Sequence, residues 1–413
     1  MSTLTHAGTR RYTGAGTSAA RLVSGPLALV FLSEFCALTC FYLLLSATPV
    51  YAAAGGGSAG AGLVTGALLL GTVLAELAAP VLMSRYGYRA LLAAGAVLLG
   101  VPALALLPGG PLAVIAAVSV VRGLGFGLCT VVTGAFTAVL LPPERRGEGL
   151  GLFGVVACVP GVVALPSGVW LAGHYGFALV VAMAAAAALV PLAAVPWLPG
   201  AAGRRAAGAR ADAGQPAPLL ASLRRGGQLR PFVIFAASTV AAGVVVSFLP
   251  LAGGVSGSIA AAGLFAQALT ATVGRWWAGR YGDRHGHARL LIPGLAIASA
   301  GMAAMIWLAS PAAVIAGMCV FGLGFGITQN ATFVLMIDRM PASGAGTASA
   351  LWNLAYDAGY GAGPAAFGLF AGHTGYPAAF ALTGVLMLAV LPAARRESAA
   401  GTAAADVTAR SGR

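Results

Sequence analysis

The heptapeptide Val121-Arg-Gly-Leu-Gly-Phe-Gly127 returns almost unchanged as Val320-Phe-Gly-Leu-Gly-Phe-Gly326, which is 199 residues further along the chain. Two further matches share this offset: Ala172-Gly-His-Tyr-Gly-Phe177 with Ala371-Gly-His-Thr-Gly-Tyr376, and Arg85-x-Gly87 with Arg284-x-Gly286. Three matches in one register, without a gap, indicate that the chain consists of two copies of one structural unit.

The composition indicates a membrane protein. Of the 413 residues, 59% are hydrophobic and only 8% are charged, and the mean hydropathy is +0.91; soluble domains carry about 25% charged residues. The formal net charge is +13, and all 23 basic residues are arginines. They stand singly or in pairs between long apolar runs, which is typical of membrane proteins. We therefore expect a lipid bilayer as a partner and no nucleic acid.

Twelve apolar runs predict membrane-spanning helices, because a span needs about 20 mostly apolar residues. The first set of six lies at 27–48, 60–82, 90–107, 112–139, 149–171 and 177–198. The second set lies at 231–252, 259–279, 290–309, 312–337, 345–371 and 376–394. Six spans per copy is an even number, so the copies are parallel repeats, with a binding site expected where they meet near the membrane midplane.

The arginines also predict the orientation. The short loops on one side carry no Arg, Asp or Glu, and the only ionisable side chains of note there are His174 and His373. The opposite, arginine-rich side is therefore cytoplasmic, and both tails lie there; we expect a bacterial plasma membrane. The predicted parts are a cytoplasmic N-terminal tail (1–25), an N-terminal six-helix bundle (26–198), a cytoplasmic linker (199–230), a C-terminal six-helix bundle (231–394) and a cytoplasmic C-terminal tail (395–413).

The loop after the eighth span resembles the signature of the major facilitator superfamily, roughly G-x-x-x-D-R-x-G-x-x-R. It reads Gly279-Arg-Tyr-Gly-Asp283-Arg284-His-Gly286-His-Ala-Arg289, and its copy after the second span keeps Arg85, Gly87 and Arg89 but has Ser84 in place of the Asp. Two further segments resemble the drug-efflux and sugar-efflux permeases of that superfamily: Arg145-Arg-Gly-Glu-Gly149 and Asp357-x-Gly359-x-Gly361-x-Gly363-Pro364. Exporters of the superfamily often carry a G-P-x-x-G-G type stretch in the fifth span. Here only a remnant of that stretch is present, Val159-Pro160-Gly161.

This resemblance implies an all-α membrane protein with twelve transmembrane helices in two pseudo-symmetric six-helix bundles. It also implies transport by alternating access, with no cofactor and no enzymatic activity. We expect Asp283 and Arg284, together with Arg85 and Arg89, to form a cytoplasmic gate. Glu76 is assigned to the same gate because its repeat partner, Arg275, has the opposite charge.

Charged residues inside spans are expensive and are functional candidates by default. Asp357 lies about 18 Å into its helix, near mid-bilayer. Burial disfavours the charged form of a carboxyl, which suits a group that loads and releases a proton. Asn353, Tyr356 and Tyr360 accompany it on the same or an adjacent stripe of the helix. The alternative is a structural clamp, in which Asp357 is hydrogen-bonded to the opposite half.

Glu34 is the second proton-coupling candidate and a substrate-binding candidate. It lies about 12 Å into the first span, and in the superfamily the first helix lines the central cavity. Its alternative role is an ion pair with an arginine. Arg122 in the fourth span is predicted to be a fixed positive charge that modulates a carboxylate or holds an anionic group of the substrate. The alternative is a buried arginine that donates hydrogen bonds to backbone carbonyls. Gln329 and Asn330 are candidates for hydrogen-bonding a ligand, or for bonds between helices.

The five cysteines all lie in apolar runs and form no metal-ligand spacing, so we expect neither a disulfide nor a metal site. Our interpretation is a monomeric, proton-coupled exporter (an antiporter) of a small organic molecule. A proton-coupled uptake symporter for a sugar or an organic acid is the second hypothesis. A polytopic membrane enzyme is the third, but the loops opposite the arginine-rich side offer only two isolated histidines to support it.

Overall fold

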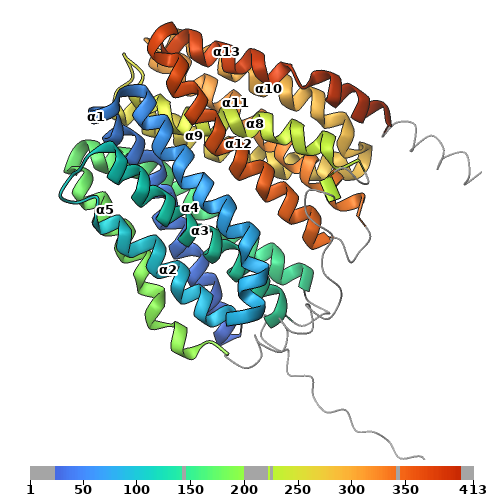
Figure 1. Ribbon diagram of the computed structural model, residues 1–413. Coiled ribbons are helices and arrows are strands. Elements are labelled where there is room, and N and C mark those ends of the chain that lie inside the picture. The colour runs from blue at the N-terminus through green and yellow to red at the C-terminus, as the bar shows by residue number, and fades with distance from the viewer. Residues whose placement is uncertain (1–23, 142–145, 200–221, 224–226, 341–344, 401–413) are drawn as a thin grey trace, which may run out of the picture.

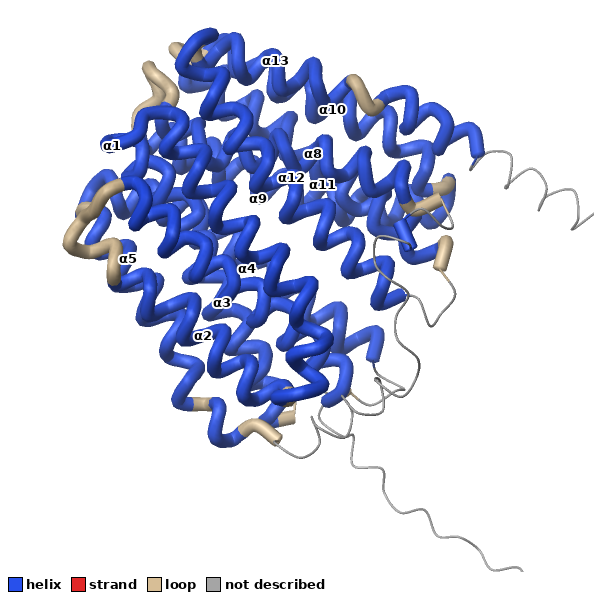
Figure 2. The backbone as a smooth tube through the Cα atoms, viewed as in Figure 1, coloured by secondary structure: helices blue, strands red, loops and turns tan. Residues whose placement is uncertain are grey.

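The computed structural model describes residues 24–141, 146–199, 222–223, 227–340 and 345–400. Within these ranges all the regular structure is helical, and no strand occurs (Figure 2). Figure 1 shows two groups of helices side by side, blue to green for the first half of the chain and yellow to red for the second. The fold is that of a twelve-helix membrane protein with two pseudo-symmetric six-helix bundles, as the sequence predicts.

The helices follow the predicted spans closely. In the first half they are α1 (Gly25–Tyr86), α2 (Tyr88–Leu104), α3 (Leu112–Leu140), α4 (Arg146–Tyr175) and α5 (Phe177–Leu189), which continues through the 3-10 turns η2 (Val190–Ala193) and η3 (Val195–Trp197). In the second half they are α8 (Leu229–Phe248), α9 (Gly257–His285), α10 (Leu291–Ala304), α11 (Pro311–Asp338), α12 (Ala345–Thr374) and α13 (Tyr376–Leu388).

Nine stretches of the described chain are long and apolar enough to cross a membrane. Helix α1 supplies two spans, because its 62 residues fold back at Gly57, where φ is 58°. The sequence predicts a loop there; the structure instead keeps both arms helical up to one glycine, the residue type that adopts this backbone conformation without strain. The shorter α2 and the more polar α12 complete the twelve.

Glycines show that the two halves are copies of one unit. A Cβ added at Gly123 of α3 would overlap the carbonyl oxygen of Leu68, and one at Gly322 of α11 would overlap that of Gln267. Both members of this contact, glycine and carbonyl, are shifted by the same 199 residues. The Gly-x-Gly-x-Gly stretches are therefore packing surfaces, on which the missing side chains let two backbones approach closely.

The halves touch mainly along α1 and α12. Ser58 Oγ, beside the kink of α1, donates to the carbonyl oxygen of Gly368 at 2.8 Å. One turn further along α1, a Cβ at Gly62 would overlap the backbone of Pro364. This end of the molecule, which carries the α1 kink and lies at the upper left of Figure 1, is called the kink end. The opposite end, where α1 begins, is called the arginine end.

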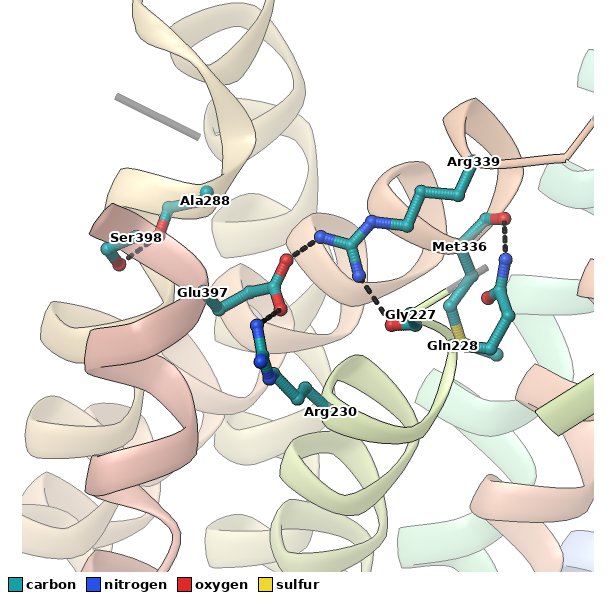
Figure 3. Close-up of polar contacts among 8 residues, drawn as sticks. All are labelled: Gly227, Gln228, Arg230, Ala288, Met336, Arg339, Glu397 and Ser398. Atoms are coloured by element: carbon teal, nitrogen blue, oxygen red, sulfur yellow. Dashed lines mark hydrogen bonds and ion pairs between the residues drawn. The ribbon is translucent and has the colours of Figure 1, made fainter. Parts of the chain in front are cut away.

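At the arginine end, one carboxylate joins three helices of the second half (Figure 3). The helix over 391–400 buries Glu397, which is 1% exposed and ion-pairs with Arg339 and, at 3.9 Å, with Arg230. Burial and the neighbouring Arg230 guanidinium lower the pKa of Arg339, so the two cations would repel each other without Glu397. The segment expected as a tail from residue 395 thus begins as a packed helix.

Candidate functional site

Two acidic side chains from opposite halves meet at the centre of the bundle. Asp357 lies about 18 Å along α12 and is only 6% exposed. Its carboxyl is hydrogen-bonded to the carboxyl of Glu76, on the second arm of α1. Glu76 is predicted from the sequence to belong to the cytoplasmic gate, whereas the structure places it against Asp357.

Arg275 of α9 also makes a polar contact with the other half. Its Nη2 donates to Gln329 Oε1 of α11 at 2.5 Å, and its Nη1 donates to Cys158 Sγ of α4 at 3.5 Å. Its Nε is buried and has no hydrogen-bond partner among the described residues. The guanidinium thus links α9 to both α11 and α4, and its Nε–H donor remains unused.

These two contacts are related by the sequence repeat. Glu76 and Arg275 occupy the same position in the two copies, and so do Cys158 and Asp357, because each pair is separated by 199 residues. The pseudo-twofold axis therefore carries the α1–α12 contact onto the α9–α4 contact. Both contacts lie at the interface of parallel repeats, the place where transporters of this architecture bind substrate and coupling ions.

Tyrosines surround the two contacts. The Tyr42 hydroxyl on the first arm of α1 is hydrogen-bonded to Tyr356, and Tyr42 also interacts electrostatically with Arg275 and Asp357. The rings of Tyr356 and Tyr360 stack with their centroids 5.4 Å apart. We refer to the following residues as the central cluster: Tyr42, Glu76, Cys158, Arg275, Gln329, Tyr356, Asp357 and Tyr360.

Glu34 and Arg122 both lie inside the first half. Glu34 is 4% exposed and accepts a hydrogen bond from Thr133 Oγ1 of α3 at 2.5 Å. Arg122 is 1% exposed and is hydrogen-bonded to Cys40 of α1, while its Nε and Nη2 have no partner in the described part of the chain. The contacts therefore link neither residue to Asp357.

The remaining polar candidates lie near the central cluster. Asn330 follows Gln329 on α11, points toward Gly279 of α9, and has a buried Oδ1 without a hydrogen-bond partner among the described residues. Asn353 is half-buried on α12, one turn from Asp357. Both amides therefore lie on helices that carry members of the central cluster.

The residues expected at the cytoplasmic gate lie at the arginine end. Asp283 and Arg284, at the end of α9, are exposed, and Asp283 Oδ1 lies 3.8 Å from His287 Nε2. Arg85 and Arg89 are exposed at the junction of α1 and α2.

Three members of the central cluster were not predicted as site residues from the sequence: Tyr42, Cys158 and Arg275. The signal for the last two was present, since they are the repeat partners of Asp357 and Glu76. Once the Glu76–Asp357 contact is known, the 199-residue offset predicts the contact between their repeat partners, Arg275 and Cys158. Without that first contact, the offset alone does not show which residues meet. Among the described residues, no group of three His, Cys, Asp or Glu side chains could hold a metal ion.

A buried aspartate hydrogen-bonded to a glutamate, and an arginine with an unpaired Nε, between two pseudo-symmetric helix bundles are typical of a membrane transporter. A sequence model of the Major Facilitator Superfamily matches residues 30–364. The chain therefore belongs to the major facilitator superfamily. No curated protein gave a significant match to the chain.

Solved structures share the fold over almost the whole chain. A D-xylose-proton symporter superimposes with a TM-score of 0.72 at 16% identity, covering 89% of this chain and 96% of that one. A peptide transporter gives 0.70 at 18% identity, with 90% and 94% covered. A bacterial homologue of the human lysosomal transporter Spinster, in an inward-facing and occupied conformation, gives 0.70 at 15% identity, with 92% and 96% covered.

Proposed function

We propose that this transporter exports a small organic molecule in exchange for protons, by alternating access, across a bacterial plasma membrane. The observation that carries the proposal is the buried Asp357, hydrogen-bonded to Glu76 between the halves, where a proton can bind from either side as the halves rock. Glu34 is the second titrating carboxyl. Arg122 provides a fixed positive charge within the first six-helix bundle.

The orientation follows from the distribution of arginine. The arginine end faces the cytoplasm, together with both tails, and the kink end faces outward. Among the described residues, the contacts between α1 and α12 run from Ser58 at the kink end to Glu76 and Asp357, and we therefore infer that the protein is closed outside and faces the cytoplasm. Asp283, Arg284, Arg85 and Arg89 then close the inner side when the outer side opens.

The substrate fits among aromatic rings and amides. Tyr42, Tyr356 and Tyr360 offer ring faces and hydroxyls, while Gln329 and the free donor of Arg275 offer polar contacts. Asn330 and Asn353 extend this surface. This combination suits a partly apolar molecule with one or two polar groups. The protein is proposed to work as a monomer and without a cofactor.

Reconstitution tests the proposal. A thermal-shift screen on detergent-purified protein identifies a ligand, and vesicles then measure its movement under an imposed proton gradient. We expect gradient-driven transport by the wild type and its loss in the double variant Glu34→Gln, Asp357→Asn. Unchanged transport in that variant would refute the assignment of both carboxyls.

Uptake symport of a sugar or an organic acid is the second candidate. It is favoured by the fifth span, where Val159-Pro160-Gly161 is only a remnant of the exporter stretch. The same vesicles decide between the two hypotheses. An antiporter moves substrate against the direction of the proton, and a symporter moves both in the same direction.

A further inference from the structure

We propose that Glu76 and Asp357 hold one proton between them, and that this shared proton keeps α1 and α12 in contact while the protein is closed at the kink end. Loss of the proton then separates the two helices. The proposal rests on the proposed proton coupling, but it assigns the coupling to a pair of carboxyls that spans both halves.

The carboxyl pair is the last of a series of contacts. Passing from the kink end toward the arginine end, α1 presents Ser58, Gly62, Gly66 and Leu69 to α12. These are mainly backbone contacts, and among the described residues of this stretch, from Ser58 to Leu69, the polar bond to α12 is that of Ser58 to Gly368. Two turns beyond Leu69 along α1, Glu76 reaches Asp357. The pair therefore contributes the strongest polar attraction along this seam.

One proton changes the sign of that interaction. Two ionised carboxylates at hydrogen-bonding distance repel each other, and the repulsion is large in a medium of low dielectric constant. With a single proton, the protonated group donates to the ionised group in a short, charge-assisted hydrogen bond. The pair titrates as a unit, so the proton belongs to both residues. On opening, it leaves to the solution that enters between the halves.

The groups around the pair leave this proton in place. Arg275 from α9 interacts electrostatically with Tyr42 and Tyr356, but its own hydrogen bonds go to Gln329 and Cys158. Tyr42 on α1 bonds to Tyr356. Tyr360 on α12 also interacts electrostatically with Asp357. On α3, Arg122 is bonded to Cys40, and Cys129 interacts with Glu34 and Cys40 rather than with the pair. Helix α8 also packs on α12, where Thr239 is hydrogen-bonded to Ala355 and Gly243 lies against the backbone of Tyr360. Neither residue has a titratable side chain.

The repeat makes the effect one-sided. At the equivalent position in the α9–α4 contact stand Arg275 and Cys158, which form a cation–thiol contact without a shared proton. Protonation thus acts on the α1–α12 seam alone and leaves the α4–α9 seam unchanged. A one-sided effect of this kind lets proton binding favour one of the two conformations of a pseudo-symmetric protein.

The test uses the full-length protein in membranes and compares Glu76→Gln with Asp357→Asn. Infrared difference spectra are recorded as the pH is changed. We expect one protonated-carboxyl band that disappears in both single variants and persists in Glu34→Gln. A band that disappears in only one of the two variants would mean that the proton is not shared and would overturn the proposal.

Transport in vesicles provides the second measurement. In each single variant an amide replaces the protonated acid, so we expect gradient-driven accumulation to fall to the level measured without a gradient, while exchange at equal pH continues. Asp338→Asn, an exposed change of the same chemistry at the end of α11, is the control and should behave as wild type. Accumulation that persists in Glu76→Gln but is lost in Glu34→Gln would overturn the inference and leave proton coupling intact. A wild type without gradient-driven transport, but with the shared infrared band, would refute the proposed function alone.

Discussion

Adding one methyl group at Gly62 should open the kink end. In the structure, the Cβ of Gly62→Ala would overlap the carbonyl oxygen of Pro364 and come close to Ala365. Both obstacles are backbone atoms, so the helices themselves must separate, by about 1 Å to restore an ordinary carbon–oxygen contact. Overpacking of this kind costs about 1–3 kcal/mol.

That cost applies only to the conformation seen here, because the two helices part when the kink end opens. A difference of about 1–3 kcal/mol corresponds to a shift of about 5- to 150-fold in the ratio of the two conformations. Since the change removes no bond from the central cluster, substrate contacts should be preserved. We therefore expect the outward-open form to become the major one.

The assay measures a distance across the kink end. Spin labels at Tyr175→Cys and Thr374→Cys, two exposed and repeat-related positions at this end, report the separation of the halves in a background without native cysteines. Gly173→Ala is the matched control, since a Cβ there meets nothing within 4 Å. The reasoning fails if Gly62→Ala gives the same distance distribution as Gly173→Ala.

Two further changes test other parts of the structure. Glu397→Gln leaves Arg230 and Arg339 facing each other without a carboxylate between them. Because both arginines are partly exposed, we expect the unfolding free energy to fall by about 1–2 kcal/mol, seen as a lower Tm in detergent. An unchanged Tm would mean that solvent already screens the two arginines. Arg275→Lys removes the planar guanidinium that is hydrogen-bonded to Gln329. Ligand affinity should therefore fall by about tenfold or more, measured as a smaller ligand-induced Tm shift. Wild-type affinity would show that a positive charge at this position is sufficient for ligand binding.

Much of the fold could be predicted from the sequence, because lipid imposes simple rules. Span number follows from the length of apolar runs, and the duplicated architecture follows from matches such as Gly123 with Gly322. These glycines have a packing role in both halves, which is why the pattern survived in both copies. The kink at Gly57 was not predictable in the same way, since Ala and Gly on either side of it allow helix or loop.

The centre of the site could be predicted only in part. Burial of Asp357 near mid-membrane followed from its distance along the helix. Its contact with Glu76 did not, because two residues 281 positions apart meet only when the halves are placed against each other. Arg122 and Glu34 illustrate the same limit: helix rotation turns both toward neighbours within their own half, and rotation is poorly encoded in helices that are apolar all round.

The carboxylate of Glu397 has a mechanical consequence. It fastens the first turn of α8, the last turn of α11 and the helix over 391–400 into one piece, and Ser398 adds a bond to the carbonyl of Ala288 at 2.7 Å. Helices fastened at their tips cannot slide past one another independently. These helix ends are therefore expected to move together in any rearrangement of the second bundle.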